Sequence, residues 1–277
     1  MSPAVFRDLP AGPVFELGLP EGVDEACHWQ GLRGDSLGLA IAEASLQSRN
    51  RTLVVITSES LAAQRLCDQL AFFLGGADAV PWLLLPDWEC LPYDNVSPHQ
   101  FLISERLRAL HRIPDLRPGI VVLPATSLIQ RLPPKRFVED STVLLRVGDR
   151  LNLESLRVKF QKAAYQFVSQ VVAPGEFSTR GGIIDLFPMG SEEPYRIDLL
   201  DDVIDSIRIF DPETQRTVGK SDTLEMLPAR EFPLNDHAIA EFRSAFRRVF
   251  SGDPQQYAVY RDVSKGITPA GIEFYLP

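Results

Sequence analysis

The sequence predicts an α/β protein in which a parallel sheet is followed by a smaller α+β region with an antiparallel sheet. Apolar runs alternate with helix-like segments in the first half, as in parallel α/β folds. Short strands separated by turn residues dominate after the proline-rich segment 132–135. The 277 residues are enough for two or three small domains, each with its own core.

Helical spacing and continuous apolar runs alternate along the first half of the chain. Apolar residues fall on one helical face in segments 36–48 and 60–74. Ser97 and Pro98 are predicted to be the N-cap and first residue of a third helix. The apolar runs are typical of strands buried on both faces of a sheet, and they cover residues 53–57, 81–85 and 119–123.

Turn clusters divide the second half into shorter elements. One helix is predicted at 152–164, followed by strands at 182–187, 195–200 and 203–210. Apolar residues recur at helical spacing from Ile239 to Val249, which predicts an amphipathic helix. Asp253-Pro254 is predicted to open a further helix.

Composition restricts the classes of function. A net charge of −9 and a sequence pI near 5.0 make the chain a poor general nucleic-acid binder and favour a basic protein partner. Apolar runs are far shorter than the roughly 20 residues that span a bilayer. Three separated cysteines without a CxxC motif, and no visible secretion signal, predict reduced thiols in the cytoplasm. No two histidines have metal-ligand spacing, so no zinc site is predicted.

A glycine-rich segment lies where an α/β nucleoside triphosphatase (NTPase) has its phosphate-binding loop. That loop needs GxxxxGK[ST], because lysine reaches the phosphates and a hydroxyl binds Mg²⁺. Here Leu37 replaces the lysine, Gly38 replaces the hydroxyl residue, and Ser36 replaces the last glycine. Together with Gly31 and Gly34 these residues predict a degenerate, non-functional phosphate loop, folded as a strand-to-helix turn.

Two other patterns could indicate catalysis. Residues 34–38 fit the GxSxG signature of esterases, but no histidine has an aspartate three residues before it, so no triad is predicted. Aspartates gather at 198–211, where a metal site is possible but solvated turn positions are favoured. No catalytic residue and no metal ligand is therefore predicted.

The strand predicted at 195–200 suggests a binding surface. Because side chains alternate between faces, Arg196, Asp198 and Leu200 are expected to point outward. A guanidinium beside an exposed apolar side chain is typical of a binding hot spot, and Arg180 can join them. An ordinary surface with one exposed leucine stays an equal alternative.

Several motifs carry a resemblance to a known family. They are GEFSTRGGIIDLFP at 175–188, PYRID at 194–198, DVIDSIR at 202–208, FD at 210–211 and QRT at 215–217. This pattern is similar to the UvrA-binding domain that UvrB shares with the transcription-repair coupling factor (Mfd) family. Further stretches resemble that second family in particular: DWE at 87–89, LPYD at 91–94, SPHQ at 97–100, VSKG at 263–266 and PAGIE at 269–273.

The resemblance implies three parts: a Rossmann-like, degenerate NTPase/helicase-like domain 1a at 1–135, an inserted UvrA-binding domain 2 at 136–225, and the start of domain 1b at 226–277. It implies UvrA contacts at Arg180, Arg196 and Leu200. Leu200 departs from the phenylalanine common in the family. Unlike UvrB, the chain passes from Tyr93 into its next helix without room for the aromatic hairpin that probes damaged DNA.

The implied function is recruitment of UvrA to stalled RNA polymerase, with neither ATP hydrolysis nor damage probing in this chain. In the family, ATP and Mg²⁺ belong to a C-terminal motor, which makes the whole protein an ATP-dependent DNA translocase. RNA polymerase and DNA are partners of the remaining chain, and the C-terminal region contacts domain 2. Two alternatives are weak ATP turnover and DNA binding through Arg106, Arg108 and Arg112, which otherwise form a solvated helix face.

Overall fold

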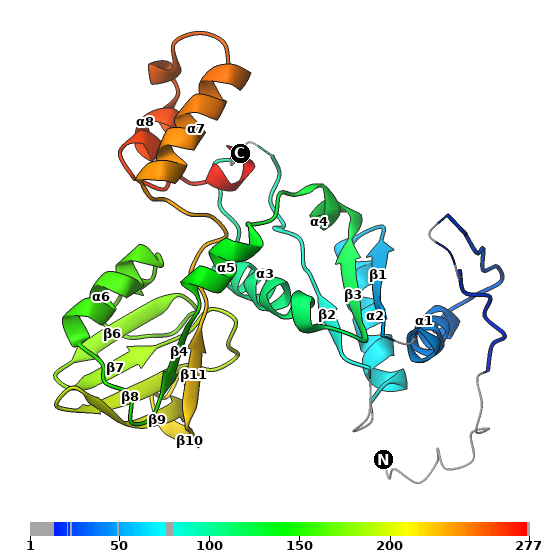
Figure 1. Cartoon of the computed structure of the whole chain (residues 1–277), viewed down its shortest axis with the longest axis horizontal. Coiled ribbons are helices and arrows are strands. Elements are labelled where there is room, and N and C mark those ends of the chain that lie inside the picture. Colours follow the sequence, from blue (N-terminus) through cyan, green and yellow to red (C-terminus); the bar gives the residue numbers. More distant parts are fainter. Residues whose placement is uncertain are drawn as a thin grey trace. The chain divides into compact units, whose positions relative to one another are not determined.

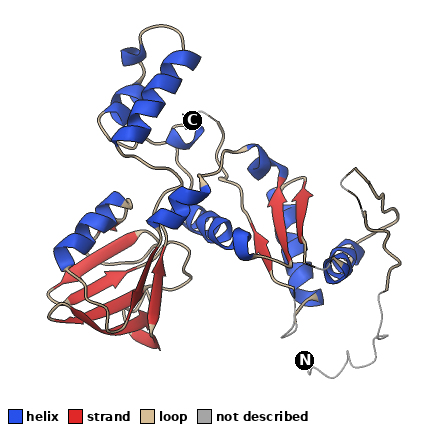
Figure 2. Ribbon diagram, viewed as in Figure 1, coloured by secondary structure: helices blue, strands red, loops and turns tan. Residues whose placement is uncertain are grey.

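The computed structural model describes residues 14–20, 22, 24–48, 50–75, 80–92 and 94–275, in a mixed α/β architecture (Figures 1 and 2). The chain divides into two compact units. The first combines Met1–Leu84 with Ile113–Ala125, and the second combines Leu85–Arg112 with Thr126–Pro277. No helix in the described part is long and apolar enough to cross a membrane.

The first unit contains a three-stranded parallel sheet in the order β1-β3-β2. Ala63 and Leu70 of one helix pack with Ile120 and Val122 of the central strand in the core. The alternation of strands and helices confirms the predicted parallel α/β fold. The elements are α1 (Ser36–Gln47), β1 (Thr52–Thr57), α2 (Ser60–Phe73), β2 (Trp82–Leu84), η1 (Ile113–Asp115) and β3 (Gly119–Pro124).

The prediction that the first strand is buried on both faces is wrong. Val54 and Ile56 of β1 are 60% and 51% exposed, whereas Leu53 and Val55 on the other face pack against the core. The reason lies in the strand order, since β1 is at the sheet edge and β3, in the centre, is buried along its whole length. A continuous apolar run therefore does not distinguish an edge strand from a central one.

The second unit is organised around a six-stranded sheet in the order β10-β9-β8-β7-β6-β5. Its pairs are antiparallel except β5 with β6, which confirms the predicted antiparallel sheet. The strands are β5 (Gln166–Phe167), β6 (Glu176–Arg180), β7 (Ile183–Leu186), β8 (Tyr195–Leu200), β9 (Val203–Phe210) and β10 (Thr217–Ser221). A separate antiparallel pair joins β4 (Val143–Arg146) to β11 (Thr223–Met226).

A helix covers one face of this sheet. Helix α6 (Leu153–Lys162) lies against the sheet (Figure 1). Its Leu156 and Phe160 share a core with Ile184, Ile197 and Ile207 of β7, β8 and β9. The helix begins after Asn152, whose side chain caps it by accepting a hydrogen bond from the Ser155 backbone at 2.9 Å, which confirms the helix predicted at 152–164. Ile103 and Leu107 of α3 (Gln100–Arg112) and Val138 of α5 (Lys135–Ser141) join the same core, and a short helix, α4 (Ala125–Ile129), follows β3.

The last segment is helical and has its own aromatic core. Phe242 and Phe246 on α7 (Asp236–Val249) pack against Tyr260 on α8 (Ala258–Ser264), which confirms the predicted amphipathic helix. Asp253 caps η2 (Pro254–Gln256) by accepting a hydrogen bond from the Gln255 backbone at 3.0 Å. A final turn, η3, spans Ile272–Tyr275.

The predicted N-cap at Ser97 is wrong, because α3 begins three residues later at Gln100. The Ser97 hydroxyl instead accepts a hydrogen bond from the Gly271 backbone and donates one to Glu273, both at 3.0 Å. Gly271 has φ +76°, and a Cβ there would lie 2.2 Å from the Asp94 carbonyl oxygen. The chain near residue 271 therefore closes tightly against the loop before α3.

A buried ion pair lies at the centre of the second unit. Arg106, predicted on an exposed helix face, is fully buried, and its Nε donates to Glu231 at 2.6 Å. Glu231 also accepts from the Trp88 indole at 3.1 Å, and the guanidinium lies 5.1 Å from the Trp88 ring centroid. A further guanidinium nitrogen donates to the Pro86 carbonyl. Arg106 therefore belongs neither to a solvated face nor to a DNA-binding patch.

We expect Arg106→Met to lower the free energy of unfolding of the second unit by about 3–5 kcal/mol, because it leaves the Glu231 carboxylate buried without its counter-charge. Urea unfolding followed by circular dichroism measures this loss. The matched control is Arg108→Met on the same helix, whose pairs with Glu105 and Glu192 are partly exposed, with an expected loss below about 1 kcal/mol. Equal losses in the two variants would contradict the central role of the buried pair.

The three cysteines should differ in reactivity towards iodoacetamide at pH 8. Burial raises the pKa of Cys67 to about 12, and burial also raises the pKa of the half-buried Cys90. Cys27 is exposed. Because the thiolate is the reacting species, mass spectrometry should find Cys27 modified first and Cys67 last. Early modification of Cys67 in the folded protein would show that α2 is not packed as described.

Candidate partner-binding site

The candidate site lies on the face of the six-stranded sheet opposite α6. Residues paired directly across antiparallel strands project from the same face. Two such rows cross this outer face: Arg180–Ile183–Asp198–Ser206 and Ser178–Asp185–Arg196–Arg208. The alternate residues Ile184, Ile197 and Ile207 enter the core on the other face. The sheet thus brings Arg180 and Arg196, which are distant in sequence, onto one surface.

Arg196 lies on the outer face, as strand alternation predicts, but its side chain is only 22% exposed. Its Nε and Nη2 donate to the two carboxylate oxygens of Asp185 at 2.6 and 2.8 Å, and its guanidinium lies 5.0 Å from the Phe210 ring centroid. The hydrogen bond to Asp185 raises the pKa of Arg196 above its usual value. Since Asp185 is buried, loss of Arg196 would leave an unpaired carboxylate.

Arg180 and Leu200 are more accessible. Leu200 is 68% exposed, and Arg180 is exposed and donates from Nη2 to the Ser169 carbonyl. The turn after β6 and the turn after β8 lie at the same end of the sheet, since Leu199 donates its backbone N–H to the Gly182 carbonyl at 2.8 Å. Ile183, 38% exposed, sits opposite both Arg180 and Asp198 in the register. No sequence motif singled out Ile183, although strand alternation is enough to place it on this face.

The aspartates of 198–211 have separate roles. Asp198 accepts hydrogen bonds from Arg208 and from Ser206 on the neighbouring strand, and so belongs to a cross-strand ion pair. Asp201 occupies the β8–β9 turn with φ +56°. Asp211 accepts from the Thr214 backbone at 2.6 Å, which lowers the pKa of Asp211. Among the described residues no three carboxylate, histidine or cysteine groups are arranged to hold a metal ion.

The glycine-rich segment has a different geometry from the predicted turn. Among the described residues before α1 there is no strand, so the expectation of a strand-to-helix turn is wrong. Gly31 and Gly34 have φ of +78° and +55°, and the Ser36 hydroxyl donates to the Arg33 carbonyl at 2.8 Å. Leu37 is partly exposed and offers no charge.

The entrance to α1 is occupied by a neighbouring side chain. Gln69 of α2 donates to the Asp35 carboxylate at 2.7 Å. A Cβ at Gly38 would lie 2.5 Å from the Gln69 Cβ, so Gly38 allows the two helices to approach each other. A hydroxyl-bearing residue at position 38 would have to displace Gln69.

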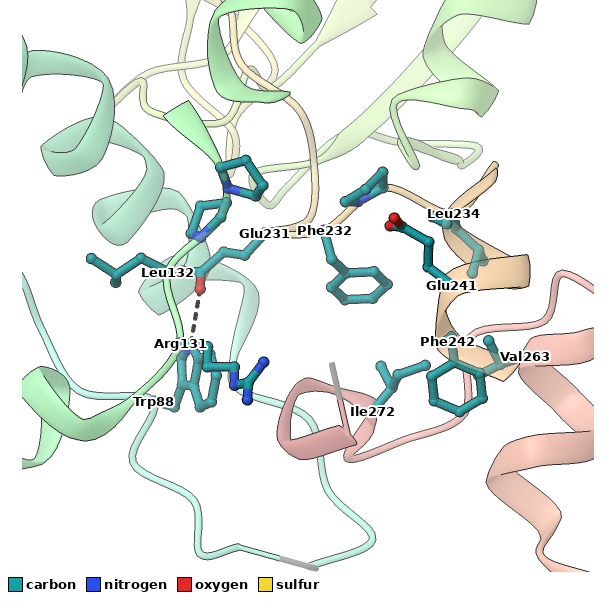
Figure 3. A pocket seen from close by; sticks show the side chains of 14 residues that line it. Trp88, Arg131, Leu132, Glu231, Phe232, Leu234, Glu241, Phe242, Val263 and Ile272 are labelled. Carbon is teal, nitrogen blue, oxygen red and sulfur yellow. Dashed lines mark hydrogen bonds between the residues drawn. The ribbon is translucent and has the colours of Figure 1, made fainter. Parts of the chain in front are cut away.

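A cavity of about 140 Å³ lies beside the buried ion pair (Figure 3). Phe232, Phe242 and Ile272 form apolar walls, and the Glu231 carboxylate accepts from Trp88 at its edge. Glu231 is already neutralised by Arg106. The cavity therefore offers apolar contact and contains no arrangement of a nucleophile with a base.

Comparison with known proteins identifies the region that contains the outer face. Residues 143–232 match the UvrB interaction domain family. A transcription-repair-coupling factor of Haemophilus influenzae is 44% identical over 242 residues, which cover 86% of this chain and 20% of that protein. The corresponding factor of Escherichia coli is 41% identical over 251 residues, 90% of this chain and 22% of that protein.

A more distant relative, from Bacillus subtilis, is 32% identical over 235 residues, which cover 85% of this chain and 19% of the relative. The chain thus spans about one fifth of the length of these relatives. The similarity extends well beyond the matched domain, into the segments on both sides of residues 143–232. Most of this chain is therefore related to about one fifth of the transcription-repair-coupling factors, and residues 143–232 match the UvrB interaction domain.

Proposed function

We propose that this chain is a docking module that recruits UvrA to stalled RNA polymerase in transcription-coupled nucleotide excision repair. The observation that carries the proposal is the outer face of the sheet within the UvrB interaction domain, where Arg180 and Leu200 are exposed at one end and Arg196 lies on the same face. A guanidinium with free donors beside an exposed apolar side chain suits a protein interface.

The three proposed contact residues would act differently. Arg180 keeps most of its donors free for a carboxylate of the partner, since its one hydrogen bond is to the Ser169 carbonyl. Leu200 would bury its apolar surface against the partner. Arg196 presents only the edge of a guanidinium that Asp185 and Phe210 hold in place, so it loses little side-chain entropy on binding.

The same proposal assigns no ATPase and no damage-probing activity to this chain. The Leu37 and Gly38 positions support the first part, because neither can neutralise phosphate or bind Mg²⁺. For the second, residues 85–92 and 94–99 form no strand, and Tyr93 lies outside the described residues. ATP and Mg²⁺ would belong to a C-terminal motor of the longer protein, an ATP-dependent DNA translocase.

The broader architecture and setting are part of the proposal. The parallel sheet would be a Rossmann-like, degenerate NTPase/helicase-like domain at 1–135, with UvrA-binding domain 2 at 136–225 and the start of domain 1b at 226–277. The matched range 143–232 overlaps the proposed domain 2. RNA polymerase and DNA would bind other parts of the longer protein, the C-terminal region would contact domain 2, and the setting would be cytoplasmic.

We expect Arg180→Ala and Leu200→Ser each to weaken UvrA binding about tenfold or more, as for truncation of interface hot spots. Isothermal calorimetry of the chain with purified UvrA measures the dissociation constant. These variants test the site better than Arg196→Ala, which would also leave Asp185 buried and unpaired.

Matched controls lie on α7, outside the UvrB interaction domain. Arg248→Ala and Val249→Ser remove an exposed guanidinium and an exposed apolar side chain of similar accessibility. Both should leave the affinity unchanged. If the controls weaken binding as much as the sheet variants, or if the sheet variants bind normally, the docking surface lies elsewhere.

The pure chain should not turn over ATP, and neither should Leu37→Lys. That variant restores a phosphate-binding charge but no metal-binding hydroxyl, and Gln69 still occupies the entrance to α1. A coupled phosphate-release assay with increasing ATP measures turnover. Saturable release above the protein-free rate by the unaltered chain would support the weak ATPase alternative and reject this part of the proposal.

A further inference from the structure

A series of hydrogen bonds connects Arg180 and Arg196, two of the arginines on the outer face, through a loop to which neither arginine belongs. Arg180 donates to the carbonyl of Ser169, and Arg196 donates from Nη1 to the carbonyl of Gln215 at 3.4 Å. The connection is closed by Gln215, whose side-chain nitrogen donates to the carbonyl of Val171 at 3.1 Å. Ser169 and Val171 lie two residues apart in the loop 168–173, between β5 and β6.

Gln215 is held firmly enough to act as the link. Its backbone has φ +59°, and its N–H donates to the Asp211 carbonyl at 2.8 Å. The same side-chain nitrogen also donates to the Pro212 carbonyl at 2.8 Å, which fixes the amide orientation. The half-buried Gln215 thus uses its backbone carbonyl towards Arg196 and its side chain towards the loop.

The loop 168–173 is anchored by the buried Val171, whereas Ser169 is exposed to solvent. Val171 is fully buried and packs with Phe187 and Phe210, the ring under the Arg196 guanidinium. Ser169 is exposed between these anchors and presents the carbonyl that Arg180 binds. A displacement of Val171 would therefore move the acceptor that orients Arg180.

We propose that Gln215 is a positioning residue of the UvrA-docking surface, which sets the direction of the Arg180 guanidinium by fixing the loop 168–173. This inference rests on the proposed function. Gln215 need not touch the partner, because its contribution passes through Val171 and Ser169 to Arg180. The partner chemistry that fits the surface is a carboxylate for Arg180 beside an apolar group for Ile183 and Leu200.

A double-mutant cycle with Gln215→Met and Arg180→Ala tests the inference. Methionine has a similar length and the same cost at positive φ, but it has no amide donor for Val171. Calorimetry with purified UvrA should show binding weakened about fivefold or more by Gln215→Met alone, and less than about twofold when Arg180 is already alanine. The control is Glu213→Gln in the same exposed turn, which should leave the affinity unchanged.

A second measurement reports on the loop itself. Hydrogen exchange followed by mass spectrometry should show faster exchange in a peptide covering 168–173 for Gln215→Met, and unchanged exchange in β7 and β8. Equal losses of affinity in the two backgrounds, no loss with Gln215→Met, or unchanged exchange in the loop would each overturn the inference while leaving the proposed function intact. Failure of the unaltered chain to bind UvrA would overturn both.

Discussion

The second unit depends on one buried interaction, the ion pair of Arg106 with Glu231. Arg106 comes from α3, Glu231 from the segment that leaves the UvrB interaction domain, and Trp88 from the loop before α3. A buried charge without a partner lowers the stability of the fold by several kcal/mol, so the ion pair holds these three segments together. The Ser97–Glu273 contact then holds the end of the described chain against the same loop.

The six-stranded sheet also relies on ion pairs, but these are less buried. On its outer face, Asp185 pairs with Arg196 and Asp198 pairs with Arg208, each across neighbouring strands. A slip of one residue would expose Ile184 and Ile197 and would separate both ion pairs. The apolar and the polar face therefore specify the same register. The result is a rigid support on which Arg180 and Leu200 remain accessible.

Local sequence patterns predicted the elements well, and they failed where a side chain meets a distant partner. Alternation placed β8 and β9, and helical spacing placed α7, because these signals are contained within one element. Nothing near Arg106 reveals Glu231, which lies 125 residues away in sequence. Arg196 faces outward as predicted, but its partner Asp185 becomes visible only once the register of β7 and β8 is known. The prediction of an N-cap at Ser97 failed for the same reason, because the Ser97 hydroxyl accepts from the Gly271 backbone and donates to Glu273.

Arg180 and Arg196 differ in how much contact with water each side chain has already lost on folding. Arg196 is desolvated in the free protein and satisfied by Asp185, so a partner gains little from its charge but meets it in a fixed place. Arg180 and Leu200 are still solvated, so in the proposed complex most of the binding free energy would come from burying these two side chains. Arg196 therefore stabilises the outer face through Asp185, whereas Arg180 is the arginine that the proposal assigns to direct contact with the partner. Exposure and existing partners separate these roles where the sequence motif alone cannot.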